Sequence, residues 1–134
     1  MTPVDILIVD DDPNVSKAIQ RALKPSGYQI QSAGSGPEAL ELLSGFDAKV
    51  IISDVKMRLM DGFELLNKVH ARCPATSRMV LSGHTDVALI LKLVNQNGID
   101  RYLTKPWEPE DLLLAVETCV DLYDLRCTSG TPPV

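Results

Sequence analysis

Short apolar runs and helix-like stripes of apolar residues alternate along the chain. The first run, at residues 4–9, is rich in aliphatic residues and is followed by three acids, which is typical of a buried strand. The next stretch carries Val15, Ala18, Ile19 and Leu23 at helical spacing, so these residues share one face of a helix. Further strands are expected at residues 28–33, 48–53, 78–82 and 100–104.

Polar residues, proline and glycine mark the ends of the helices between these runs. Helices are expected to begin near Pro13, Ser35, Asp61, Thr85 and Pro109. Five strands that alternate strictly with five helices predict an α/β fold, in which a doubly wound parallel sheet carries helices on both faces. We expect this domain to span residues 1–124, and residues 125–134, which end in Pro- and Gly-containing sequence, to be a tail or the start of a linker.

Composition narrows the possible classes of protein. Of the 134 residues, 45% are apolar and 23% are charged, which is a globular composition and not a disordered one. The apolar runs are far shorter than the ~20 residues of a membrane helix, and the N-terminus lacks the pattern of a signal peptide, so we expect a cytoplasmic protein that does not bind membranes. The net charge of −5, without a basic run, argues against direct nucleic-acid binding. Three cysteines without Cys-x-x-Cys spacing and two histidines argue against a disulfide framework and a zinc site.

Candidate chemistry is concentrated just after the predicted strands. Asp10 and Asp11 follow the first strand, Asp54 the third, Ser82 ends the fourth, and Lys105 follows the fifth. The carboxyl ends of parallel strands meet at one edge of an open sheet, where ligands bind, so these five side chains are expected to converge.

This combination of residues suits the binding of a cation and a phosphoryl group. Converging carboxylates repel one another unless a hard cation such as Mg²⁺ neutralises them. A hydroxyl and an ammonium group, here from Ser82 and Lys105, are suited to phosphoryl oxygens. The central acid, Asp54, could then act as a nucleophile toward an activated phosphoryl donor.

Taken together, Asp10-Asp11, Asp54, Met60-Asp61-Gly62, Ser82-Gly83 and Lys105-Pro106 resemble the motifs of a two-component response-regulator receiver domain. Each motif is weak alone, but all five occur in the right order at predicted strand ends. The resemblance covers residues 4 to about 123 and implies a flavodoxin-like receiver fold with strand order 2-1-3-4-5.

The resemblance also implies a signalling switch that catalyses only its own phosphorylation and dephosphorylation. A sensor histidine kinase or phosphotransfer protein would phosphorylate Asp54, with Mg²⁺ as cofactor. Ser82 and Tyr102 would form the switch that changes the surface. The other implied roles are metal binding by Asp10 (through water), Asp11, Asp54 and the Lys56 carbonyl, phosphoryl binding by Ser82 and Lys105, and tuning of the phosphoryl lifetime by Lys56 and His84.

One position departs from the common family pattern. Arg58 stands where the loop after the phosphoacceptor usually has a proline. Without the proline ring the backbone is less restricted, so the loop that presents the Lys56 carbonyl is expected to be more mobile.

Three leucines suggest an interface. If Val87, Ile90, Leu91 and Val94 form the buried stripe of the fourth helix, Leu89 and Leu93 point the other way. Leu114 points away from the buried stripe of the last helix. Exposed leucines on the face formed by the fourth helix, fifth strand and fifth helix indicate a site for homodimerisation or for contact with an output partner, and isolated surface leucines are the alternative.

Two other functions remain open. The pattern Asp10-x-Asp12-x-Asn14 is similar to the signature of hydrolases of the haloacid-dehalogenase type, which would place the phosphorylated acid at Asp10 and leave Asp54 without a role. A receiver used only as a constitutive docking surface would bind no Mg²⁺. Neither the cognate kinase nor the output follows from these residues.

Overall fold

The computed structural model describes residues 4–83, 88, 91 and 99–128, and the structural statements below concern these residues. It contains a five-stranded parallel sheet with the order β2-β1-β3-β4-β5, as the sequence predicted. The strands are β1 (Val4–Val9), β2 (Ile30–Ala33), β3 (Ala48–Asp54), β4 (Ser77–Ser82) and β5 (Arg101–Thr104). The helices are α1 (Pro13–Leu23), α2 (Gly36–Leu43), α3 (Gly62–Arg72) and α5 (Pro109–Thr128), with a 3₁₀ turn, η1 (Lys24–Ser26), after α1.

The fourth predicted helix falls almost entirely outside the described residues. Ala88 and Leu91 are described, and both are helical. Leu91 is 49% exposed, so the prediction that it belongs to the buried stripe is wrong. Leu89, Leu93 and His84 lie outside the described residues.

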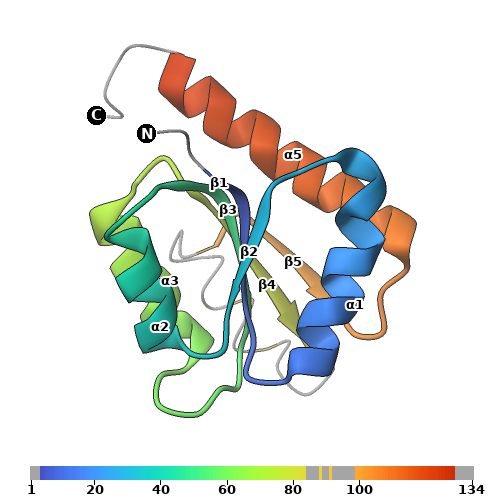
Figure 1. Cartoon of the computed structure of the whole chain (residues 1–134), viewed down its shortest axis with the longest axis horizontal. Helices are drawn as coiled ribbons and strands as arrows, with labels where there is room; N and C mark the ends of the chain where they lie inside the picture. The colour runs from blue at the N-terminus through green and yellow to red at the C-terminus, as the bar shows by residue number, and fades with distance from the viewer. Residues whose placement is uncertain (1–3, 84–87, 89–90, 92–98, 129–134) are drawn as a thin grey trace.

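The helices cover both faces of the sheet, with α1 and α5 on one side and α2 and α3 on the other (Figure 1). Side chains along a strand alternate between the two faces. In β1, Ile6 and Ile8 therefore pack toward α1 and α5, whereas Leu7 and Val9 pack toward α2 and α3. All four are fully buried, and burial of each stabilises the fold by roughly 1.5–3 kcal/mol.

Side-chain caps explain where three helices begin. A carboxylate oxygen of Asp12 accepts the Asn14 N–H (2.9 Å), and one of Asp61 accepts the Glu64 N–H (2.8 Å). The Ser35 hydroxyl accepts the Glu38 N–H (3.2 Å). Each cap satisfies a donor that the helix itself leaves unpaired.

Two elements differ from the prediction by more than one residue. β2 begins at Ile30 and not at Tyr28, because η1 and Gly27, with a φ of 79°, first turn the chain, and the Gln29 N–H donates to the Asp5 carboxylate (2.8 Å). α5 continues four residues beyond the predicted boundary at 124, to Thr128.

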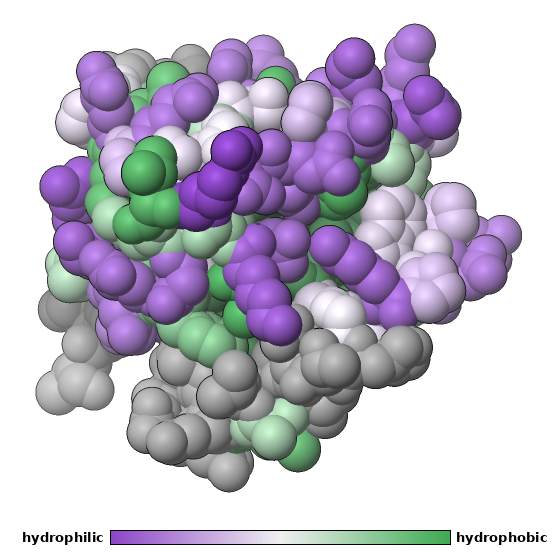
Figure 2. All heavy atoms as spheres, turned by 90° about the horizontal axis from the view of Figure 1, so that it is seen from below, coloured by the Kyte–Doolittle hydropathy of each residue, from purple (hydrophilic) through white to green (hydrophobic). Residues whose placement is uncertain are grey.

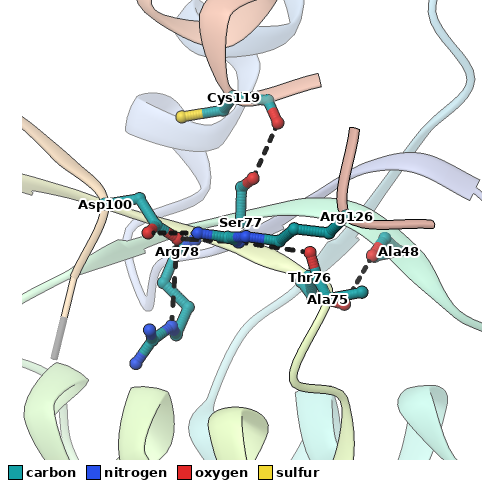
Figure 3. A network of polar contacts seen from close by, with 8 residues as sticks. All are labelled: Ala48, Ala75, Thr76, Ser77, Arg78, Asp100, Cys119 and Arg126. Atoms are coloured by element: carbon teal, nitrogen blue, oxygen red, sulfur yellow. Dashed lines mark hydrogen bonds and ion pairs between the residues drawn. The ribbon is translucent and has the colours of Figure 1, made fainter. Parts of the chain in front are cut away.

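A polar network at the amino end of β4 holds this last turn of α5 (Figure 3). Asp100, just before β5, accepts a hydrogen bond from Arg126 Nη2 at 2.7 Å and another from the Arg78 N–H at 2.8 Å. Arg126 also donates to the Ala75 carbonyl at 3.3 Å. Burial lowers the pKa of the Arg78 guanidinium, and the charge of Asp100 opposes that shift. One carboxylate thus joins β4, β5 and α5.

Two buried hydroxyls reinforce the same region. Ser77 Oγ donates to the Cys119 carbonyl of α5, and Thr76 Oγ1 donates to the Ala48 carbonyl of β3, each at 2.7 Å (Figure 3). Burial raises the pKa of the Cys119 thiol to about 11, so this cysteine acts as a small apolar core residue.

Removal of the Asp100 carboxylate should lower the free energy of unfolding far more than removal of the Arg126 guanidinium. Asp100→Ala leaves two cations facing each other, one of them nearly buried, and is expected to lower the free energy of unfolding by about 3 kcal/mol. Arg126→Met keeps most of the aliphatic stem and should have a smaller effect. Urea unfolding measures both, and equal losses for the two variants would contradict the central role of Asp100.

Candidate functional site

The carboxyl ends of the strands form the edge of the sheet that Figure 2 views from below, where hydrophilic side chains surround a few apolar ones. This is the edge at which the sequence placed its candidate residues. Asp54 ends β3, Ser82 ends β4, and Lys105 follows β5.

The Asp54 carboxylate lies between a backbone donor and a cation. Its Oδ1 accepts the N–H of Val55 at 2.7 Å, and its Oδ2 lies 3.4 Å from Lys105 Nζ. The side chain is 18% exposed, so the carboxylate remains accessible from solvent. The expected proximity of Asp54 and Lys105 is confirmed.

The acids after β1 occupy three different environments. Asp10 is buried and accepts the N–H of Asp12 at 2.9 Å. Burial raises the pKa of Asp10, and the negative charges of Asp54 and Asp11 raise it further. Asp11 is partly exposed and contacts Arg58, whose backbone N–H lies 3.1 Å from Asp11 Oδ2 and whose Nε lies 3.6 Å from it. Asp12 is exposed and caps α1.

Ser82 carries a buried hydroxyl without a hydrogen-bond partner among the described residues. The residue is fully buried, and its carbonyl accepts the N–H of Lys105 at 2.7 Å, which holds the end of β5 against the end of β4. The Lys105–Pro106 peptide bond is cis. A buried hydroxyl without a partner costs about 1–3 kcal/mol, so such a group points to a ligand that completes it.

The loop from β3 to α3 folds closely over the acceptor strand. The Gly62 N–H donates to the Val55 carbonyl at 2.8 Å, and a Cβ at Gly62 would lie 2.2 Å from the Asp54 carbonyl oxygen. Only glycine fits there. Leu59 has a φ of 74° and is 85% exposed, and the Met60 N–H donates across it to the Arg58 carbonyl. This three-residue turn is strained for a residue with a branched side chain, and no pattern along the chain predicted it.

Beside this loop lies a depression of about 520 Å³. Its lining residues are Asp11, Val55, Lys56, Met57, Arg58, Asp61 and Phe63. The depression opens next to two of the predicted site residues, the acid Asp11 and the exposed Lys56.

The remaining predicted residues have clear positions. Tyr102 is partly buried and packs against the core beneath α2 and α3. Leu114 is 60% exposed on α5. Within the described ranges, no three His, Cys, Asp or Glu side chains lie close enough together to hold a metal ion. The predicted convergence of the acids is therefore incomplete, because Asp54, Asp11 and Asp10 each have a separate partner from the chain itself.

The chemical nature of these side chains nevertheless suits a hard cation, because all three offer carboxylate oxygens. Asp10 carries the electrostatic influence of Asp54 and Asp11, so the three carboxylates act on one another, and all offer oxygen ligands. Burial and the negative charges of Asp54 and Asp11 raise the pKa of Asp10, and the positive charge of Lys105 opposes that shift.

Comparisons with known proteins agree with this geometry. The family model described as "Response regulator receiver domain" matches residues 6–117. The hydrogenase transcriptional regulatory protein HoxA of Bradyrhizobium diazoefficiens is 33% identical over 96% of this chain and 26% of its own length. The DNA-binding transcriptional regulator NtrC of Escherichia coli is 30% identical over 88% of this chain and 25% of its own length. The chain thus spans about a quarter of these relatives.

Solved structures show the same fold. An uncharacterised protein from Neptuniibacter caesariensis superposes with a TM-score of 0.92 at 33% identity, covering 98% of this chain and 97% of that one. The signal receiver domain of an HD domain-containing protein from Pseudomonas fluorescens Pf-5 gives a TM-score of 0.87 at 33% identity, covering 96% and 95%.

Removal of the charge of Asp10 should stabilise the protein in the presence of EDTA. The pKa of Asp10 in the folded state is raised above the ordinary value of 3.8, so the folded chain binds the proton more tightly than the unfolded chain. The contribution of Asp10 to the free energy of unfolding therefore declines as the pH rises from the ordinary pKa through the raised one. Asp10→Asn keeps an oxygen that can accept the Asp12 N–H but removes the charge. Urea unfolding should therefore show a gain at pH 7 that shrinks toward pH 4. Asp12→Asn, at an exposed cap, is the control, and an equal gain in both variants would contradict the assignment of the strain to Asp10.

Proposed function

Because the chain belongs to the family of response-regulator receiver domains, we propose that it is a phosphorylation-dependent signalling switch with Asp54 as phosphoacceptor. The observation that carries the proposal is the Asp54 carboxylate, open to solvent at the end of the central strand, with the Lys105 ammonium 3.4 Å away. Leu81 of β4 pairs with Asp54 of β3, so the Ser82 hydroxyl, which has no hydrogen-bond partner among the described residues, lies one residue further along β4.

The proposed reaction is a transfer of one phosphoryl group. A carboxylate oxygen of Asp54 forms a bond to phosphorus, while the bond from phosphorus to the donor nitrogen of a phosphohistidine breaks. The leaving imidazole takes up a proton. Lys105 offsets negative charge on the phosphoryl oxygens, and the Ser82 hydroxyl donates to one of them, which would satisfy the buried group.

Mg²⁺ is the proposed cofactor. Asp11, Asp54 and the Lys56 carbonyl would hold it directly, and Asp10 would hold it through water. When bound, Mg²⁺ supplies the positive charge that the acids and the incoming phosphoryl oxygens require. Supporting this are the oxygen donor set and the electrostatic coupling of Asp10 to Asp11 and Asp54. We also propose that the exposed side chain of Lys56, together with His84, tunes the lifetime of the phosphoryl group.

The proposed switch runs from Ser82 to Tyr102. A bond from the Ser82 hydroxyl to a phosphoryl oxygen would draw the end of β4 toward Asp54. Tyr102, partly buried on the adjacent strand, would then move further into the core and reshape the surface around β5 and α5. This is a shift between two states that phosphorylation biases.

The proposed partners follow from the family. A sensor histidine kinase or a phosphotransfer protein would supply the phosphoryl group in the cytoplasm, and the reshaped face would act on a partner or an attached output domain. None of the helices within the described residues is long and apolar enough to cross a membrane. Leu114, exposed on α5, would belong to this face, together with Leu89 and Leu93.

Acetyl phosphate is a direct test of the phosphoacceptor. With Mg²⁺, the parent should gain one phosphoryl group by mass spectrometry of the intact protein. Asp54→Asn should abolish this gain, because the amide is not a nucleophile. Asp12→Asn, which changes an exposed acid of the same edge, should label like the parent.

The same experiment separates the competing hydrolase. If Asp54→Asn retains full labelling while Asp10→Asn loses it, the nucleophile is Asp10 and the receiver proposal fails. If the parent takes up no phosphoryl group from any donor and binds no Mg²⁺, the domain is a constitutive docking module.

The interface proposal predicts a loss of self-association. Leu114→Asp places a charge in a desolvated contact and should weaken association of the beryllofluoride-treated protein about tenfold in sedimentation experiments. Leu125 is also exposed and lies about three turns further along the same face of α5, so Leu125→Asp shows how far along the helix the contact extends. Association of Leu114→Asp as tight as that of the parent would exclude this face as the interface.

A further inference from the structure

Arg58 binds Asp11 with both its backbone and its side chain. The backbone N–H donates to Asp11 Oδ2 at 3.1 Å, and the guanidinium Nε lies 3.6 Å from the same oxygen. The two residues are 47 positions apart, so the contact fixes the β3–α3 loop against the end of β1.

The backbone contact is possible only because residue 58 is not proline. A proline at this position has no N–H and no cation, so it could make neither interaction with Asp11. The sequence suggested only a loss of restraint at this position, whereas the structure shows a different restraint in its place.

The contact places the Arg58 guanidinium beside the carboxylate of Asp11, which is a proposed ligand of the metal ion. Asp11 Oδ2 accepts from the Arg58 N–H and lies beside the guanidinium, so part of the negative charge that a cation would need is already shared with Arg58. The contact of Lys105 with Asp54 engages a second proposed metal ligand in the same way.

We propose that Arg58 competes with the metal ion for Asp11 and so sets the Mg²⁺ affinity of the site. Arg58 is a positioning residue, which ties the conformation of the β3–α3 loop to the occupancy of Asp11. The proposal rests on the proposed role of Asp11 as a metal ligand.

The exposure of Arg58 decides the size of the effect. Its side chain is 85% exposed, so water replaces Asp11 readily and the ion pair is weak. The competition therefore changes Mg²⁺ affinity several-fold and does not prevent binding.

Two substitutions separate the two contacts. Arg58→Ala keeps the N–H and removes the guanidinium, and should tighten Mg²⁺ binding about threefold in titration calorimetry, with the gain shrinking as salt is raised. Arg58→Pro removes both contacts and should tighten Mg²⁺ binding further. The part of this gain that comes from loss of the backbone N–H should persist in high salt. Arg21→Ala, which removes the same charge from an exposed position on α1, should bind like the parent.

A metal-free measurement tests the contact itself. In EDTA, Asp11→Ala should shift the Arg58 amide resonance and speed its hydrogen exchange, because the amide loses its acceptor. Addition of Mg²⁺ to the parent should shift the same resonance in the same direction.

The outcomes distinguish the two proposals. If Asp11→Asn binds Mg²⁺ as tightly as the parent, the metal assignment of the proposed function fails, whatever the Arg58 amide shows. If Asp11 is needed for Mg²⁺ but Arg58→Ala and Arg58→Pro both bind with the parent's affinity or more weakly, the competition is overturned. An Arg58 amide unaffected by Asp11→Ala would overturn it as well.

Discussion

Repulsion among the carboxylates at the ends of β1 and β3 is the constraint around which this edge of the molecule is arranged. A parallel sheet brings these strand ends together, and Asp10 lies buried among the acids with a raised pKa. The chain limits the repulsion with its own groups, since Lys105 contacts Asp54 and Arg58 contacts Asp11. The side chains of Lys105 and Arg58 are partly or largely exposed, and their nitrogen atoms lie 3.4 and 3.6 Å from the carboxylate oxygens. Such ion pairs are weak, so other charges can replace them.

The fold remains stable despite the repulsion among these acids, because its stability comes from the hydrophobic core and from contacts at the opposite end of the sheet. Fully buried aliphatic residues fill both faces of the sheet. At the amino end of β4, away from the acids, Asp100 joins β4, β5 and α5 through two arginines. The turn at Leu59 and the Ser82 hydroxyl, which has no hydrogen-bond partner among the described residues, both lie near the strand ends where ligands bind.

Receivers share a scaffold, and differences in their loops can set how the shared site behaves. Here the β3–α3 loop departs from the common pattern at Arg58, and the departure adds a contact. Gly62 keeps the loop on the Asp54 backbone, where no side chain fits. The loop is therefore held at two points. Gly62 packs against the backbone of Asp54, and Arg58 forms an ion pair with Asp11 that other charges can replace.

The sequence by itself determined the order of the elements and the edge at which the candidate residues gather. Short apolar runs predicted the five strands, and apolar residues at helical spacing predicted the helices that the structure describes, because both patterns are local properties of the chain. Pro13, Ser35 and Asp61 marked helix starts for the same local reason. The order of the five motifs indicated the receiver family, which the family model confirms over residues 6–117.

Tertiary structure alone decided which groups pair with one another. Arg58 with Asp11 and Arg126 with Asp100 join residues 47 and 26 positions apart, and no spacing rule relates them. The Arg126 contact also explains why α5 continues to Thr128, past the point where the sequence suggested a tail. Leu91 faces solvent although its spacing placed it in the core, because spacing shows which residues share a face but not which face the sheet covers.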